Sequence, residues 1–251
     1  MIVVTGPGRA GTSFLAKLYR ELGFDPGGEW YSDVNAGLER IEFLQLNRTV
    51  AEELGVALRE RRGGVIGRQL LRLLPEIDRL PLRYRRAART ALDSLRYHDS
   101  SLVDLLDWEA LDAVADRHGD EMRSLAKAQP VVKDPRFCFT LGAWLRAGAP
   151  VDSVVLTLRP LDAMVESRQR VGHLSKQALG WSKHNFAYGI GLLMTWAAEY
   201  RIPVSLLRFP DFVGDPDALY TSLPLPEPRA PEAFRAAFDR VIDPSLVHDH
   251  R

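Results

Sequence analysis

The spacing of hydrophobic residues predicts a chain that alternates between strands and helices. The apolar run at residues 2–5 predicts a buried strand, and residues 14, 15, 18, 19 and 22 are apolar at helical spacing. Further strands are predicted at residues 130–133, 151–158 and 204–207, and helices over residues 38–62 and 68–126. We therefore expect an α/β fold whose central, mostly parallel sheet is flanked by helices, with ligands at the carboxyl ends of the strands.

The composition predicts a single domain whose net charge is balanced. The chain has 251 residues, of which 46% are hydrophobic, so it can bury a substantial core, and we expect a single domain over residues 1–251. Lys plus Arg and Asp plus Glu both number 33, which gives no global charge to attract nucleic acid or a membrane surface.

Cysteine usage and hydropathy set further expectations. The only cysteine is Cys138, between Phe137 and Phe139, which excludes an internal disulfide and predicts a buried structural thiol. Since the chain enters a core strand at residue 2 and has no apolar run of ~18 residues, we expect a cytoplasmic protein without a transmembrane segment.

The segment between the first predicted strand and helix carries the most chemical information. It reads Gly6-Pro7-Gly8-Arg9-Ala10-Gly11-Thr12-Ser13. Glycines let a backbone approach an anion closely, and the N–H groups and dipole of a helix start favour negative charge. The segment fits the G-x-x-x-x-G-K-[ST] template, except that Thr12 occupies the lysine position. Arg9 supplies a cation inside the loop instead, which predicts a phosphate site for a donor other than that of an ordinary ATPase or GTPase.

This segment resembles the 5′-phosphosulfate loop of sulfotransferases that use 3′-phosphoadenosine 5′-phosphosulfate (PAPS). The resemblance implies a three-layer P-loop-type fold with a helical insertion at about residues 40–126, PAPS as co-substrate, 3′-phosphoadenosine 5′-phosphate (PAP) as product, and no metal. The residues that it assigns to the 5′-phosphosulfate are Pro7, Gly8, Arg9, Ala10, Gly11, Thr12 and Ser13.

A second anion-binding pair is predicted where the strand at 151–158 ends. Arg159 closes this strand, Pro160 starts the turn, and Ser167 follows two turns into a helix. Arg159 and Ser167 can therefore converge on one anion, to which they offer two parallel donors and a hydroxyl. The resemblance assigns them to the 3′-phosphate of PAPS. From the residues alone, the alternative is an arginine that caps a strand and a serine on a solvated helix face.

The segment Lys133-Asp134-Pro135-Arg136 lies between these two sites and is similar to a bacterial branch of the family. Asp134-Pro135 ends a strand and leaves Lys133 and Arg136 at its carboxyl edge. We expect Lys133 to offset charge during transfer and Arg136 to contact the acceptor. The alternative is an ion pair between Asp134 and a neighbouring cation.

Three more segments match that branch in the same order along the chain. They are Trp181-x-x-His184-Asn185, placed before a long apolar helix; Leu206-Leu207-Arg208-Phe209-Pro210-Asp211-Phe212 with Asp215-Pro216; and Val241-Ile242-Asp243-Pro244-Ser245-Leu246. The resemblance therefore spans almost the whole chain.

Sulfuryl transfer to a hydroxyl needs a base, and Glu39 is the candidate. The branch carries a glutamate in an N-x-x-G-x-x-E segment, which here corresponds to Asn35-Ala36-Gly37-Leu38-Glu39 with shorter spacing. Asp33 and Glu42 are rivals, and the glutamate of a first helical turn is the structural alternative. His98, beside Asp99, is the substitute base on the acceptor side.

The stretch 59–96 holds eleven arginines and four acidic residues. We expect Arg83 and Arg86 in it to contact an anionic acceptor, with a solvated helix face as the alternative. The function expected overall is in-line transfer of the sulfuryl group of PAPS to a hydroxyl of a small molecule or glycoconjugate. The alternatives are a P-loop small-molecule kinase that uses Mg-ATP and a relative that binds PAPS without catalysis.

Overall fold

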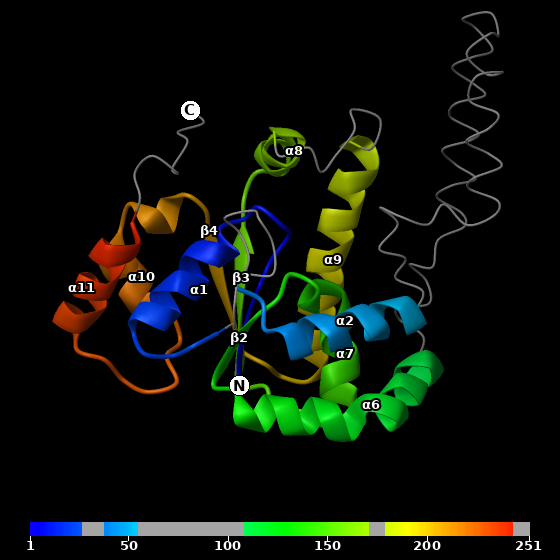
Figure 1. Cartoon of the computed structure of the whole chain (residues 1–251). Helices are drawn as coiled ribbons and strands as arrows, with labels where there is room; N and C mark the ends of the chain where they lie inside the picture. The colour runs from blue at the N-terminus through cyan, green and yellow to red at the C-terminus, as the bar shows by residue number, and fades with distance from the viewer. Residues whose placement is uncertain (27–37, 55–107, 171–178, 243–251) are drawn as a thin grey trace, which may run out of the picture.

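The computed structural model describes residues 1–26, 38–54, 108–170 and 179–242, and these form an α/β structure around one parallel sheet (Figure 1). The sheet has the strand order β2-β1-β3-β4, and all three pairings are parallel. Its strands are β1 (Ile2–Thr5), β2 (Val131–Lys133), β3 (Ser153–Leu158) and β4 (Val204–Arg208). The expected α/β class and the parallel central sheet are therefore confirmed.

Helices cover both faces of the sheet (Figure 1). One face carries α1 (Thr12–Glu21), α10 (Pro216–Ser222) and α11 (Pro231–Val241), and the short η3 (Asp211–Val213) follows β4. The other face carries α2 (Ile41–Glu53), α6 (Trp108–Ala128), α7 (Phe137–Arg146) and α9 (Leu179–Glu199). Among the described helices, α8 (Leu161–Arg170) follows β3 directly.

The alternation of side chains along the strands explains the two cores. Val3 and Val132 point into the core under α2, α6, α7 and α9, whereas Val4 and Val131 point into the core under α1, α10 and α11. Because parallel sheets are covered on both faces, their strands are apolar throughout, and all four residues of β1 are buried.

The structure corrects one detail of the sequence prediction. The segment with Trp181 and His184 does not precede the long apolar helix, because α9 begins at Leu179 and contains it. Pro231 is the first residue of α11, where a proline is well accommodated since its missing N–H has no intrahelical partner. Of the predicted insertion, α2 and α6 are described, and residues 55–107 lie outside the described part.

Candidate functional site

The predicted site residues that follow the strands lie at the carboxyl edge of the sheet, because the four strands run in the same direction and end there. Loop 6–11 follows β1, Asp134 follows β2, Arg159 follows β3 and Phe209 follows β4. Ligands of open parallel sheets bind at this edge.

Loop 6–11 is packed tightly against the two neighbouring strand ends. A Cβ on Gly6 would lie 2.5 Å from the carbonyl oxygen of Thr157, and a Cβ on Gly11 would lie 2.5 Å from the ring of Phe209. Gly11 also has φ 91° and is the N-cap of α1, a conformation that side chains other than glycine rarely adopt. Both glycines are thus required by their surroundings as well as by the turn.

The same loop offers backbone donors at the start of α1. Within the described residues, the backbone N–H groups of Gly8, Gly11 and Thr12 donate to no backbone or side-chain acceptor. Thr12 is buried, with 4% of the residue exposed. N–H groups at a helix start, together with the helix dipole, form an anion-binding position.

Two predicted residues from elsewhere in the chain meet this loop at Arg9. Arg9 Nε donates to Ser167 Oγ on α8 at 3.1 Å, and Arg159 Nη1 donates to the backbone carbonyl of Arg9 at 3.4 Å. The Arg159 guanidinium also lies over the ring of Phe209, at 5.2 Å from its centroid. Ser167 is only 7% exposed, so the alternative that it lies on a solvated helix face is wrong.

This convergence has a chemical consequence. Two guanidinium groups, a buried hydroxyl and the N–H groups of a helix start are all donors, and two of them carry full positive charge. Such a set binds a ligand with more than one anionic group better than a neutral ligand, since hydrogen bonds to charged groups are the stronger ones.

Glu39 and Lys133 form a second polar feature at the same edge. Lys133 Nζ donates to Glu39 Oε1 at 2.5 Å, and the two side chains are 2% and 14% exposed. Leu38, the residue before Glu39, is buried with φ 81°, which is unfavourable for a residue with a side chain. The chain therefore holds Glu39 on Lys133 in spite of backbone strain beside it.

Asp134 belongs to the core and does not face the donor loop. Its carboxylate is fully buried, and Asn47 Nδ2 donates to its Oδ2 at 2.9 Å. Arg136 donates to its Oδ1 twice, from the backbone N and from Nη1, each at 2.9 Å. The pair of Asp134 and Arg136 is the ion pair that was given above as the alternative for this segment. It engages the Arg136 guanidinium, which we expected to contact the acceptor.

Sequence reasoning missed Asn47. Its Oδ1 accepts from Thr140 Oγ1 at 2.7 Å and from Trp144 Nε1 at 2.8 Å, so it joins α2 to both β2 and α7. The available signal was an amide at a position of α2 that falls on the same helical face as the core residues Phe43 and Val50.

Cys138 is buried as expected, since only 3% of it is exposed. Its burial, more than any contact, raises the pKa of the thiol to about 11, against a smaller opposing effect of its hydrogen bond with Thr5 Oγ1. The thiol is therefore protonated at neutral pH.

Several predicted candidates either lie outside the described residues or are exposed. His98, Arg83, Arg86 and the rival base Asp33 lie outside the described part of the chain. Glu42 is exposed on α2. In the described ranges, no group of three or more His, Cys, Asp or Glu side chains is arranged to hold a metal ion, and no helix is both long and apolar enough to cross a membrane.

Comparisons of the chain with protein-family models, curated proteins and solved structures give no match.

Proposed function

We propose that this protein is a PAPS-dependent sulfotransferase that moves the sulfuryl group to a hydroxyl of a small-molecule or carbohydrate acceptor. The observation that carries the proposal is the meeting of Arg9, Arg159 and Ser167 at loop 6–11. The sequence resemblance assigns the loop to the 5′-phosphosulfate and the other two residues to the 3′-phosphate. PAPS carries anionic groups at both ends, which suits this set of donors.

In this proposal the loop N–H groups and Arg9 bind the 5′-phosphosulfate. Arg159 and Ser167 bind the 3′-phosphate and so discriminate PAPS from ATP, which lacks that group. Because Arg9 already contacts both of them, the two ends of the donor are recognised by one connected set of side chains. Arg9 and Lys133 offset the negative charge that develops on the departing phosphate oxygen.

Glu39 is proposed as the general base. Its Oε1 is held by Lys133, and within the described residues its Oε2 accepts no hydrogen bond. The acceptor oxygen forms the new bond to sulfur, the bond between sulfur and the bridging phosphate oxygen breaks, PAP leaves, and the acceptor proton goes to Glu39. Lys133 thus has two functions, to orient the base and to stabilise the leaving group.

The alternative of a kinase is weakened by the position of Asp134. A kinase of this architecture would need a carboxylate at a strand end near the loop to help hold magnesium. Asp134 is the carboxylate that follows β2, but its oxygens are engaged by Asn47 and Arg136 in the core. The non-catalytic alternative shares the donor site and differs from our proposal in turnover alone.

Calorimetric titration with PAP, and separately with Mg-ATP, tests the donor class. We expect micromolar binding of PAP without metal and none of Mg-ATP. Arg159→Ala should weaken PAP at least tenfold, because charged hydrogen bonds contribute about 1.5–3 kcal/mol and 1.4 kcal/mol is tenfold. The control is Arg208→Ala at the end of the adjacent strand β4, where an exposed arginine lies 3.5 Å from Asp211. Preference for Mg-ATP, or equal effects of the two variants, would refute the proposed donor.

Transfer of labelled sulfate from PAPS to a panel of hydroxyl acceptors tests turnover. Glu39→Gln keeps the size of the side chain and removes its basicity, so it should lower kcat roughly 100-fold while the affinity for PAP stays unchanged. An active wild-type protein with a fully active Glu39→Gln variant would exclude Glu39 as the base. PAP binding without turnover of any acceptor would favour the non-catalytic alternative.

A further inference from the structure

The sheet has two edge strands, β2 and β4, and the described residues cover the edge of only one of them. All three residues of β2 are buried, and the backbone N–H of Lys133, on the side away from β1, donates to the carbonyl oxygen of Pro26 at 3.2 Å. An edge strand without such a cover presents a row of unpaired peptide groups, with which another chain can pair. The strand β4 has such an edge.

The peptide groups of β4 alternate between β3 and the open edge. Phe209 N–H donates to the carbonyl oxygen of Leu158 in β3 at 2.7 Å, so the odd-numbered residues of β4 face inwards. Val204, Leu206 and Arg208 therefore face outwards, and in the described part of the chain their N–H groups donate to no acceptor. These three residues are already extended and offer donors and acceptors along one line.

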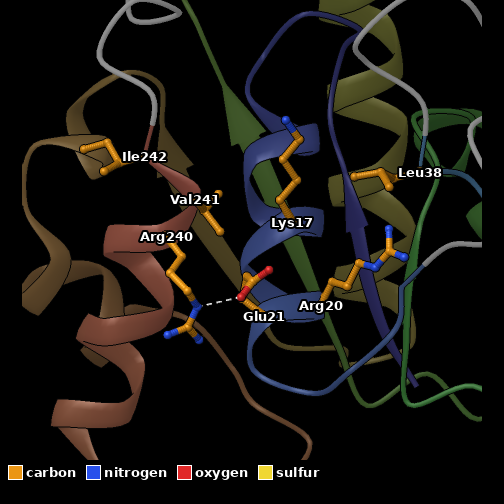
Figure 2. A pocket seen from close by; sticks show the side chains of 7 residues that line it. All are labelled: Lys17, Arg20, Glu21, Leu38, Arg240, Val241 and Ile242. Carbon is orange, nitrogen blue, oxygen red and sulfur yellow. Dashed lines mark hydrogen bonds and ion pairs between the residues drawn. The ribbon is translucent and has the colours of Figure 1, made fainter.

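The two faces of β4 also differ in exposure. Leu207 points to the side of α1, α10 and α11 and is only 5% exposed. These helices close that face, and Figure 2 shows α1 and α11 side by side, with Arg240 Nε donating to Glu21 Oε2 at 2.7 Å. Leu206 alternates with Leu207 and so points to the side of α9. It is 54% exposed, the highest value among the large hydrophobic side chains of the described residues.

Helix α9 extends this apolar surface. Its Trp196 faces α7, since a Cβ on Gly142 of α7 would lie 2.6 Å from the indole ring. Ala187, Met194 and Ala198 lie about half a turn around the helix from Trp196, and all three are exposed. Because α7 packs against β1 and α9 leads into β4, the flank of α9 away from α7 is turned towards the β4 edge.

The β4 edge surface, formed by Leu206 and this flank of α9, carries no charge. Residues 186–198 and 204–207 contain no Lys, Arg, Asp or Glu. A charged partner would lose hydration on such a surface without gaining an ion pair. A second copy of the same surface brings apolar side chains and a strand edge that needs the same hydrogen bonds. Its strand is already ordered, so pairing avoids the entropy cost of ordering a free peptide.

We infer that β4 pairs antiparallel with β4 of a second copy of this chain, around a two-fold axis at Leu206. Outward-facing residues that lie opposite each other in an antiparallel pair exchange both of their hydrogen bonds. With Leu206 opposite its own equivalent, Val204 lies opposite Arg208, and every outward residue of both strands is paired. A shift by two residues would place one of them beyond the end of the other strand.

The same symmetry brings the helices together. The axis is perpendicular to the sheet, so the two sheets become one continuous sheet and the α9 helices of the two copies lie on the same face of it. Their uncharged flanks, with Met194 in the middle, then face each other across the axis. This inference goes beyond the proposed function and does not depend on it, because the dimer can form whether or not the protein binds PAP.

Sedimentation equilibrium of the full-length protein, from micromolar to submillimolar concentration, tests the dimer. We expect a reversible species of twice the mass of the chain. Leu206→Lys should raise its dissociation constant about a hundredfold or more, because the axis places the two new ammonium groups directly opposite each other. The control is Ile41→Lys, which makes the same kind of change at a 47% exposed residue of α2 and should leave the dissociation constant unchanged.

Cross-linking tests the register. Directly opposite residues of this kind have Cα atoms about 5.5 Å apart, within the range of about 4.4–6.8 Å that a disulfide spans. Leu206→Cys should therefore give a covalent dimer on mild oxidation. Ser205→Cys is the control, since Ser205 lies opposite Leu207 of the other copy and should not cross-link to its own equivalent. The native Cys138 is 3% exposed and does not compete.

A protein that stays monomeric at all concentrations would overturn the inference, and so would equal dissociation constants for the two lysine variants. Cross-linking of Ser205→Cys as readily as Leu206→Cys would refute the register. Titration with a synthetic peptide of residues 203–209 tests the other occupant. If the protein is monomeric and binds this peptide, and Leu206→Lys abolishes that binding, the edge belongs to an extended peptide and the dimer is refuted.

Discussion

Asn47 is the residue whose replacement gives the sharpest test of how the site is held together. Asn47→Ala removes three hydrogen bonds in the core between α2, β2 and α7. Thr140 keeps a second acceptor, the backbone carbonyl of Arg136 at 3.2 Å, so it is not left unpaired. The indole N–H of Trp144 and the Oδ2 of Asp134 each lose the partner given by Asn47, and both residues are fully buried.

The magnitude follows from these two buried groups. An unsatisfied buried donor or acceptor costs about 1–3 kcal/mol, and more for a charged group. The loss of both partners should therefore lower the free energy of unfolding by about 4 kcal/mol. Natural domains are stable by about 5–15 kcal/mol, so the variant should remain folded but close to its limit.

Urea unfolding followed by circular dichroism measures this change as a lower midpoint with an unchanged slope. Thr140→Val is the matched control, because it removes one of the same hydrogen bonds and leaves Asn47 with both Asp134 and Trp144. Thr140→Val should lower the free energy of unfolding by about 1 kcal/mol. A cost below about 1 kcal/mol for Asn47→Ala, or equal costs for the two variants, would refute the view that Asn47 holds the network together. Because α2 begins just after Glu39, we also expect Asn47→Ala to lower kcat at temperatures where it is folded.

The remaining predictions concern the loop, the lysine and the thiol. Gly11→Ala should destabilise the protein by about 2 kcal/mol or more and abolish PAP binding, because its Cβ would meet Phe209; Gly23→Ala, with φ 90° and open space around it, should show only the smaller backbone cost of about 1 kcal/mol in the same unfolding assay. Lys133→Met leaves the 14% exposed Glu39 without its cation, so kcat should fall together with the thermal midpoint, and an unchanged kcat would remove Lys133 from the mechanism. Burial raises the pKa of Cys138 above its unfolded value, so its contribution to stability is present below about pH 8.5 and is lost as the pH rises towards 11; a thiol reagent should label it at neutral pH only when urea unfolds the chain, and rapid labelling of the folded protein would contradict its burial.

Hydrophobic spacing was sufficient to predict the α/β class, the four strands and the loop after the first of them. These features depend on local information, since a buried parallel strand is an apolar run and a loop before a helix is marked by its glycines. The placement of Arg159 at a strand end and of Ser167 two turns into the next helix could be predicted for the same reason. Helix boundaries were less secure, as the start of α9 at Leu179 shows, because the residues at a helix end respond to packing as much as to their own preference.

Tertiary structure decided which of these groups meet. The strand order places β1 between β2 and β3, and this brings Arg9 to Ser167 and Arg159, which follow it by about 150 residues. Along the sequence, Asp134 has two cationic neighbours, Lys133 and Arg136. In the folded chain Arg136 pairs with Asp134, and Lys133 pairs with Glu39, which precedes it by 94 residues. Such choices depend on which side of a strand each residue faces and on what packs there, so local spacing could name the candidate groups, but only the assembled sheet could choose their partners.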